Sequence, residues 1–144
     1  MSEQTNQTRE LGERYVAAWF AGDREALREV LAAGVVWSPP ASVGTTFSGA
    51  EAVAQALSGG AGAAKVRPGT IRRTLRASLV DGDSIVLLVH VEFETVSGHG
   101  YVNDAAWLLT AEHRRISRIV EYADTLLTAR AGLIPFEARS HADD

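Results

Sequence analysis

Hydrophobic residues recur along this chain with two different periods, and the change between them separates a helical part from a strand-rich part. From residue 8 to residue 21, apolar side chains return every three or four positions, which predicts an amphipathic helix. Asp23 is placed to cap a second helix that ends near Gly34. Ser48 followed by Glu51 has the spacing of a capping box, which predicts the start of a third helix.

From residue 70 onward the apolar positions alternate, which is the period of half-buried β-strands. Three helices followed by an antiparallel meander predict an α+β fold, with helices on one face of a sheet. A short buried strand precedes the meander and ends before the two prolines at 39 and 40. The four long strands are expected over residues 70–80, 85–96, 101–110 and 116–126.

The chain of 144 residues is long enough for one domain with one hydrophobic core. We expect the core of this domain to span residues 8–127. The Gly- and Ala-rich residues 58–69 are expected to form a mobile loop. Residues 128–144 form a tail, whose apolar cluster at 133–136 is expected to fold back over an opening.

The expected turns align the strands and assign residues to the two faces of the sheet. A turn after Val96 would pair that residue with Tyr101, and would place Phe93 opposite Asp104. The next turn would place Asp104 opposite Tyr122. The resulting face is apolar except for two carboxylates and one phenol, and it comprises Val89, Val91, Phe93, Val102, Asp104, Ala106, Leu108, Val120, Tyr122 and Asp124. The opposite face comprises His90, Glu92, Glu94, Asn103, Trp107, Ile119 and Glu121.

Asp104 and Asp124 are the candidate catalytic groups of the apolar face. Burial raises the pKa of a carboxyl group, and two neighbouring carboxyls push their pKa values apart, which suits acid–base chemistry near neutral pH. Tyr122 would donate a hydrogen bond to a developing oxyanion. The alternative is structural: Asp104 pairs with Arg118, and Asp124 lies at a solvated strand end.

Aromatic residues supply candidate walls for a ligand pocket. Tyr15, Trp19 and Trp37 would lie where helix and sheet meet, and Phe93 belongs to the apolar face. The four histidines show no metal-ligand spacing and cysteine is absent, so neither a metal ion nor a cofactor is expected.

Composition narrows the classes of partner. The net charge of −4 and the pI near 5.5 disfavour a nucleic-acid partner. No apolar run is long enough to cross a membrane, and the polar N-terminus lacks a signal segment, which predicts a cytoplasmic location.

Several local strings resemble one known superfamily. They are Y-V-A-A-W-F-A-G-D at 15–23, V-V-W-S-P-P at 35–40, F-S-G-A-E-A-V at 47–53, G-Y-V-N-D at 100–104 and I-S-R-I-V-E-Y-A-D-T at 116–125. The chain resembles, over about residues 8–127, the SnoaL-like and ketosteroid-isomerase-like branch of the nuclear-transport-factor-like superfamily. The resemblance implies a cone-shaped fold in which a curved, mainly antiparallel sheet wraps around three N-terminal helices and encloses an apolar pocket. It adds Tyr101 and Asn103 as candidate ligand contacts.

Two functional hypotheses follow. The first is a homodimeric, cofactor-free enzyme that performs acid–base chemistry, such as cyclisation or isomerisation, on a hydrophobic metabolite bearing a ketone or an epoxide. Resemblance to limonene epoxide hydrolases at E-Y-x-D would give the water-activating role to Asp124. The second is a binding or accessory protein that uses the same cavity. It is favoured because Val91-Glu92-Phe93 stands where those hydrolases carry Arg-x-Asp, and because residues 37–41 lack the carboxylate of the isomerases.

Overall fold

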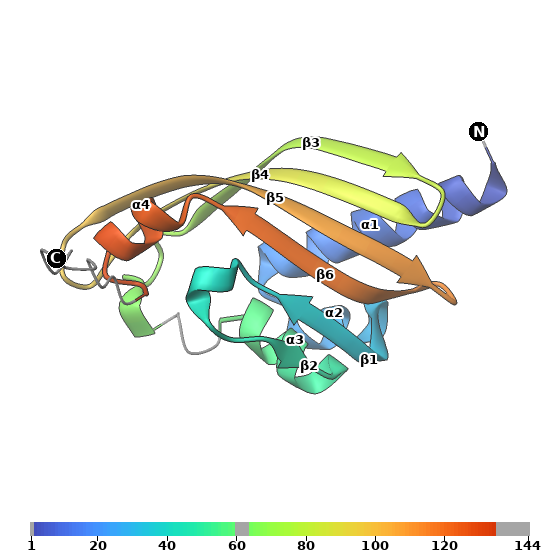
Figure 1. Ribbon diagram of the computed structural model, residues 1–144, viewed down its shortest axis with the longest axis horizontal. Helices are drawn as coiled ribbons and strands as arrows, with labels where there is room; N and C mark the ends of the chain where they lie inside the picture. Colours follow the sequence, from blue (N-terminus) through green and yellow to red (C-terminus); the bar gives the residue numbers. More distant parts are fainter. Residues whose placement is uncertain (1, 60–63, 135–144) are drawn as a thin grey trace, which may run out of the picture.

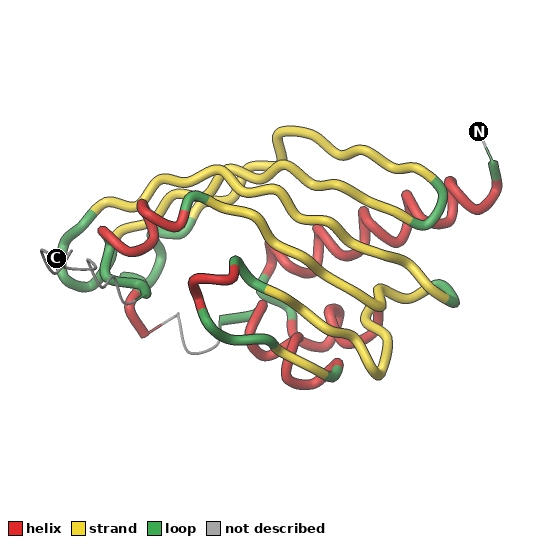
Figure 2. The backbone as a smooth tube through the Cα atoms, viewed as in Figure 1, coloured by secondary structure: helices red, strands yellow, loops and turns green. Residues whose placement is uncertain are grey.

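A curved six-stranded sheet arches over three helices in the computed structural model, which describes residues 2–59 and 64–134 (Figures 1 and 2). The strand order is β2-β1-β6-β5-β4-β3, and every neighbouring pair is antiparallel except β1 and β6. The predicted α+β class and the curved, mainly antiparallel sheet are confirmed. The strands are β1 (Leu31–Ser38), β2 (Phe47–Ser48), β3 (Arg72–Asp81), β4 (Ser84–Glu94), β5 (Gly100–Glu112) and β6 (Arg115–Ala123).

The first helices follow the apolar periodicity, with different ends. Helix α1 (Glu3–Ala21) begins before residue 8, because the side chain of Ser2 accepts a hydrogen bond from the Thr5 N–H. Helix α2 (Arg24–Val30) has the predicted Asp23 cap. Its predicted end near Gly34 is wrong, because the chain is already extended at Leu31, where β1 begins to pair with β6.

The third helix, α3 (Ala50–Leu57), begins without the predicted capping box. Gly49 is the N-cap residue, with a φ of 92° that favours glycine and with no side-chain cap. Ser48 pairs with Val36 in the sheet instead. Glu51 forms an ion pair with Arg28, 3.2 Å from Nε, which ties α3 to α2. A 3-10 turn, η1 (Ala41–Val43), follows the two prolines.

The pairing of β4 with β5 differs from the sequence-based register by three positions. Phe93 lies opposite Tyr101 and not opposite Asp104. The cause is the length of the turn: β4 ends at Glu94, and the Thr95 N–H donates to the His99 carbonyl at 2.8 Å, so five residues lie outside the strands. Because three is odd, the two faces of β5 are exchanged relative to β4.

The pairing of β5 with β6 differs from the expectation by two positions, which preserves the faces. Ala106 lies opposite Tyr122 and not opposite Val120. One position of the shift comes from the turn, which pairs Glu112 with Arg115, and the other from a bulge between Thr110 and Ala111. As a consequence, residues of β5 and β6 that were expected to share a face still share it, but that face is the outer face of the sheet and not the inner one. The inner face therefore carries Val89, Val91, Phe93, Tyr101, Asn103, Ala105, Trp107, Leu109, Ile119, Glu121 and Ala123.

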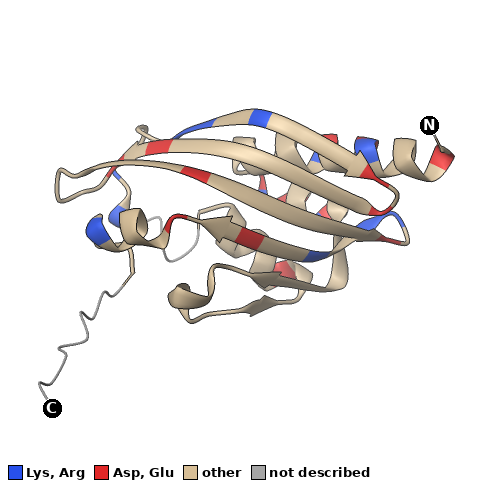
Figure 3. Ribbon diagram, turned by 45° about the horizontal axis from the view of Figure 1, so that its top comes forward, with Lys and Arg blue, Asp and Glu red and all other residues tan. Residues whose placement is uncertain are grey.

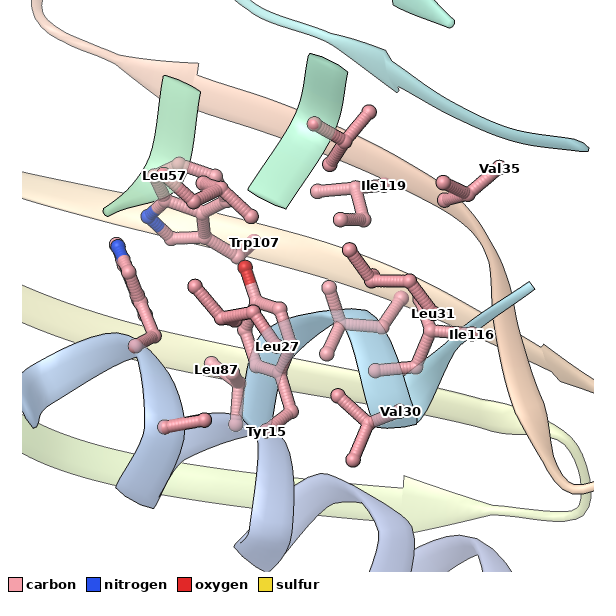
Figure 4. Packing of buried hydrophobic residues seen from close by; sticks show 14 of the residues in the cluster. Tyr15, Leu27, Val30, Leu31, Val35, Leu57, Leu87, Trp107, Ile116 and Ile119 are labelled. Atoms are coloured by element: carbon pink, nitrogen blue, oxygen red, sulfur yellow. The ribbon is translucent and has the colours of Figure 1, made fainter. Parts of the chain in front are cut away.

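The hydrophobic core occupies one half of this inner face. Ile85, Leu109 and Ile119 from three strands are fully buried in one cluster with Leu27 of α2 and Tyr15 of α1. Figure 4 shows Ile119, Leu27 and Tyr15 in this cluster. The other half of the sheet extends past α1, as the left side of Figure 1 shows. Each of β4, β5 and β6 thus contributes core residues at one end and open-facing residues at the other.

The last strand is shorter than predicted. It ends at Ala123, and Asp124 caps helix α4 (Thr125–Arg130) by accepting hydrogen bonds from the N–H groups of Leu126 and Leu127. After α4, the Gly132 carbonyl accepts a hydrogen bond from Lys65 Nζ at 3.0 Å.

The expected loop over residues 58–69 and the expected tail lie partly outside the described residues, which exclude 60–63 and 135–144. Of the loop, Val66 forms a bridge with Thr95, and the Arg67 N–H donates to the Glu94 carbonyl at 2.8 Å. None of the helices in the described ranges has the length and hydropathy needed to cross a membrane.

Candidate functional site

A cavity of about 700 Å³ lies under the half of the sheet that extends past α1. This volume is within the range of small-molecule sites. Its wall is mainly apolar and aromatic, formed by Trp19, Phe20, Trp37, Leu57, Ile71, Val91, Phe93, Tyr101, Ala105, Trp107 and Leu133. The polar side chains of the wall are Ser58, Arg67, Arg73, Asn103 and Glu121.

Glu121 brings a carboxyl group into this apolar wall. On β6, alternation turns Ile119, Glu121 and Ala123 inward, and Glu121 lies opposite Trp107 of β5. Burial raises the pKa of Glu121 to about 7. The Trp37 indole is close enough to offset part of this increase, although its N–H does not reach hydrogen-bond geometry. The carboxyl therefore changes protonation near neutral pH.

Three buried hydrogen-bond donors near this carboxyl have no partner among the described residues. They are the Tyr15 hydroxyl and the indole N–H groups of Trp37 and Trp107. The two indole rings lie 5.7 Å apart, and the Tyr15 hydroxyl points toward Trp107 (Figure 4). Buried polar groups in proteins are normally satisfied, so the two indole donors, whose rings line the cavity, fit a ligand that brings hydrogen-bond acceptors.

Arg73 supplies a positive charge on the other side of the cavity. It lies on β3 opposite Val91, and its guanidinium carbon is 5.7 Å from the centroid of the Trp19 ring. Burial lowers the pKa of Arg73, but a guanidinium stays charged at neutral pH. Burial also raises the pKa of Tyr15; Glu121 adds to this shift, and Arg73 opposes it. The Tyr15 hydroxyl thus lies within electrostatic range of both charged groups.

Asn103 and Tyr101 form a polar connection along the wall. Asn103 Nδ2 donates to the Tyr101 hydroxyl at 2.7 Å and to the Asp124 carbonyl at 3.0 Å. The Tyr101 ring stacks on Phe93 with 4.4 Å between ring centroids, and its hydroxyl lies 3.3 Å from Thr128 Oγ1 of α4. The amide therefore holds the wall of the cavity to the start of α4.

The expected positions of Asp104, Tyr122 and Asp124 on the cavity wall are wrong. Asp104 lies on the outer face of the sheet with 79% of its side chain exposed, and it pairs with His90 and not with Arg118. Tyr122 is also on the outer face, 63% exposed. Asp124 does not lie on a strand, because its carboxylate caps α4. The exchange of faces in β5 and β6 accounts for the first two positions.

Most of the residues predicted as ligand contacts do lie on the cavity wall, unlike the three predicted catalytic residues. Trp19, Trp37, Phe93, Tyr101 and Asn103 all line the cavity, and their role in binding stays a prediction. Tyr15 is fully buried beneath the wall. Glu121, Arg73 and Trp107 also line the cavity and were not predicted from the sequence. The sequence did contain a signal for the correct face. Trp107 and Ile119 lie on the same face of the sheet as Glu121, and such large apolar residues are more often buried in a core than Ala106 is.

The described residues contain no group of three or more His, Asp or Glu side chains that could hold a metal ion. The absence of a metal and of a cofactor stays a prediction. The polar groups of the cavity are those of a site for an organic ligand: one carboxyl, two guanidinium groups, one amide and several N–H and O–H donors.

Comparison with known families agrees with this architecture. A family model for the SnoaL-like domain matches residues 12–119, most of the chain. The chain belongs to the SnoaL-like domain family. This confirms the resemblance stated from the sequence. No curated protein matches this SnoaL-like chain significantly.

Solved structures share the fold at low sequence identity. An NTF2-like protein of unknown function from Burkholderia pseudomallei has a TM-score of 0.75 and 20% identity, over 94% of this chain and 100% of the other. A protein described as a SnoaL-like polyketide cyclase from Jannaschia sp. CCS1 has a TM-score of 0.75 and 16% identity, over 94% and 98%. An epoxide hydrolase of the LEH-like type from M. tuberculosis has a TM-score of 0.67 and 14% identity, over 88% and 90%. These similarities establish the cone-shaped fold.

Proposed function

We propose that this SnoaL-like protein is a cofactor-free enzyme that moves a proton on a hydrophobic metabolite bearing a ketone or an epoxide, with Glu121 as the acid–base group. The single observation that supports this most is a carboxyl with a pKa of about 7 inside an apolar cavity. Acid–base catalysis is most efficient when the pKa of the group lies near the working pH. Glu121 replaces the pair Asp104 and Asp124 in this role.

A proton shift needs no co-reactant in this arrangement. Ionised Glu121 takes a proton from the carbon next to a carbonyl, and the electron pair moves onto the carbonyl oxygen as an enolate. The indole N–H groups of Trp37 and Trp107 would stabilise that oxygen, since neither has another partner among the described residues. In an unsaturated ketone the enolate is conjugated, and protonated Glu121 returns the proton to the far carbon of the conjugated system, which completes an isomerisation. In a ring closure the enolate carbon instead attacks a second carbonyl carbon of the substrate, and protonated Glu121 gives its proton to the alkoxide oxygen that forms.

The test is turnover of a panel of hydrophobic ketones, unsaturated ketones and epoxides by wild-type protein, Glu121→Gln and Asp104→Asn. Loss of a general acid–base group lowers the rate by about 10²-fold to 10⁴-fold, so Glu121→Gln should be nearly inactive. Asp104→Asn is the matched control, because that carboxylate lies on the outer face. Equal turnover by wild type and Glu121→Gln would exclude the assignment. Carbon-13 NMR adds a direct check: the Glu121 carboxyl should titrate near pH 7.

The binding hypothesis remains the second candidate, and one observation favours it. Among the described residues that line the cavity, Glu121 is the only carboxylic acid, so a mechanism that needs two carboxylates has one too few. A binding protein would retain its ligand in Glu121→Gln and would turn over no member of the panel.

We also propose that the protein is a homodimer formed through the outer face of the sheet. Two apolar rows cross four strands there: Leu79, Val86, Leu108 and Val120 form one, and Ala77, Leu88, Ala106 and Tyr122 the other. Leu79 and Tyr122 are more than 60% exposed. Figure 3 shows that charged residues on this face are separated by long uncharged stretches. A continuous exposed apolar surface of this kind is typical of an interface.

A further inference from the structure

Arg73 is a half-buried arginine of the cavity wall that has no counterion among the described residues. Arg28 is paired with Glu51, and Arg67 at the cavity rim is paired with Glu94 at 2.8 Å. No carboxylate of the described residues lies within ion-pair distance of the Arg73 guanidinium, whose recorded contact is the face of Trp19. Glu121 shares the cavity with Arg73 but does not pair with it.

A partly buried guanidinium in an aromatic cavity is costly unless an anion accompanies it. Its planar fork of N–H donors matches the two oxygens of a carboxylate, and such charge-assisted pairs are among the strongest hydrogen bonds in proteins. The groups around Arg73 determine the chemistry expected for the remainder of the ligand. The cavity offers Arg73 as its unpaired cation, and the wall beside it is apolar, formed by Val91, Ile71 and Trp19.

We propose that the ligand of this cavity is an apolar carboxylic acid, bound as its anion with the carboxylate on Arg73 and its carbon skeleton against the aromatic wall. The inference rests on the proposed function in one respect, since the same acid would carry the ketone or epoxide that Glu121 acts upon. The carboxylate and the reacting group would then occupy opposite sides of one cavity, and the fixed Arg73 contact would orient the substrate toward Glu121.

The donor inventory supports an acceptor-rich ligand independently. Trp37 and Trp107, which both line the cavity, each carry a buried indole N–H without a partner among the described residues. A substrate with a carboxylate at one end and a carbonyl at the other brings only acceptors to these positions. A cationic or amine ligand would instead place a positive charge beside Arg73, which Coulomb repulsion disfavours.

The test uses a matched pair of probes, 4-cyclohexylbutanoate and its neutral amide, with tryptophan fluorescence as the readout. All three tryptophans of the chain line the cavity, namely Trp19, Trp37 and Trp107. Binding of a ligand should therefore change the total tryptophan emission. We expect wild-type protein to bind the acid about 10-fold to 100-fold more tightly than the amide. Equal binding of the two probes, or no binding of the acid, would overturn the inference, and this comparison requires no variant.

Variants then locate the effect. Arg73→Gln should reduce the acid-to-amide ratio to about one, and Arg73→Lys should keep part of it, because a charge without the fork remains. Arg72→Gln is the control, since Arg72 is the neighbour on β3, lies opposite Glu92 and is exposed. A ratio that falls equally in Arg72→Gln would refute a specific site at Arg73.

The two proposals fail separately. Glu121→Gln should keep the preference for the acid even though it loses turnover. If Glu121→Gln is fully active, the proposed function is wrong while the acid-to-amide ratio still decides the ligand class. If the ratio is one in wild type, the ligand class is wrong while the effect of Glu121→Gln on turnover still decides the catalytic role.

Discussion

His90 and Asp104 face each other across β4 and β5, with 2.8 Å between imidazole Nδ1 and carboxylate Oδ1. Glu92 approaches the other ring nitrogen at 3.3 Å. The hydrogen bond to Asp104, and then that to Glu92, raises the pKa of His90. A histidine of this kind stabilises the fold below its unfolded pKa of about 6.5, and the contribution disappears as the pH rises through the folded value. The pair is a surface feature of the outer face.

Replacing Asp104 by Asn should therefore lower the pKa of His90 toward its ordinary value and leave ligand binding unchanged. The measurement is the pH dependence of the His90 ring signals by NMR. Asp81→Asn, an exposed carboxylate at the end of β3, should leave those signals as in wild type. Loss of turnover in Asp104→Asn would contradict this placement and would return Asp104 to the catalytic candidates.

Glu121→Gln should make stability less dependent on pH. The folded pKa of about 7 exceeds the ordinary value of 4.5, so the folded protein binds the proton more tightly than the unfolded chain. Stability from this group is therefore full below about pH 4.5 and is lost as the pH rises to about 7, by about 3 kcal/mol. Urea unfolding at about pH 5 and about pH 8 measures the difference. Wild type should lose more stability than Glu121→Gln between the two; parallel losses would show that Glu121 is not buried.

Tyr15→Phe separates a structural role from a ligand-binding role. The Tyr15 hydroxyl is buried without a partner among the described residues, so its removal should leave stability unchanged or increase it by about 1 kcal/mol. Ligand binding should stay close to that of wild type, as measured by tryptophan fluorescence, because the Tyr15 hydroxyl lies beneath the cavity wall and not in it. Tyr122→Phe, which removes an exposed hydroxyl on the outer face, is the matched control. A large loss of stability in Tyr15→Phe would mean that the hydroxyl is satisfied in solution.

Asp124→Ala should destabilise the protein by about 1 kcal/mol, because it removes the cap of α4. Asp124→Asn should be close to wild type in stability, since asparagine is an equally good cap. Both variants should retain turnover in proportion to the folded fraction. If Asp124→Asn is inactive yet fully folded, the carboxylate has a chemical role that its position as a cap does not explain.

A charge in the middle of the outer face should dissociate the proposed homodimer. Leu88→Asp places a carboxylate between Ala77 and Ala106 in one of the two apolar rows, where a dimer would bury it without a partner. Light scattering after size-exclusion chromatography should then give the monomer mass of 15.4 kDa. Val96→Asp, in the exposed β4–β5 turn, is the control and should leave the dimer intact. A monomeric wild-type protein would exclude the proposal.

The elements of the fold were predictable because hydrophobic period and turn residues are local properties. Helix α1 and strands β3 to β6 follow from them to within a few residues. The register was not predictable, because the five-residue turn after Glu94 and the bulge between Thr110 and Ala111 depend on hydrogen bonds that form only in the assembled sheet. The parallel pairing of β1 with β6 is likewise a tertiary contact.

The candidate site depended on that register more than the fold did. The aromatic residues of the wall were found, since large aromatic side chains are buried in almost any arrangement. The carboxyl was misassigned, because an odd shift moved Asp104 outward and Glu121 inward together. Arg73 was not predicted either: only the pairing of β3 with β4, which places Arg73 opposite Val91, turns this arginine toward the cavity.

Lys65 is the only lysine of the chain, and its amine contacts the Gly132 carbonyl between two segments that both reach the cavity. The N-terminal amine has a lower pKa than lysine, about 8 against about 10.4, and can be blocked first near neutral pH. An amine-reactive dye added afterwards at higher pH would then attach at Lys65 alone, beside the cavity. Such a dye would serve as an energy-transfer acceptor for the three indoles of the cavity. Energy transfer from tryptophan to a dye on Lys65 would report how these two segments move when a ligand binds. The measurement needs one labelled sample and no substitution.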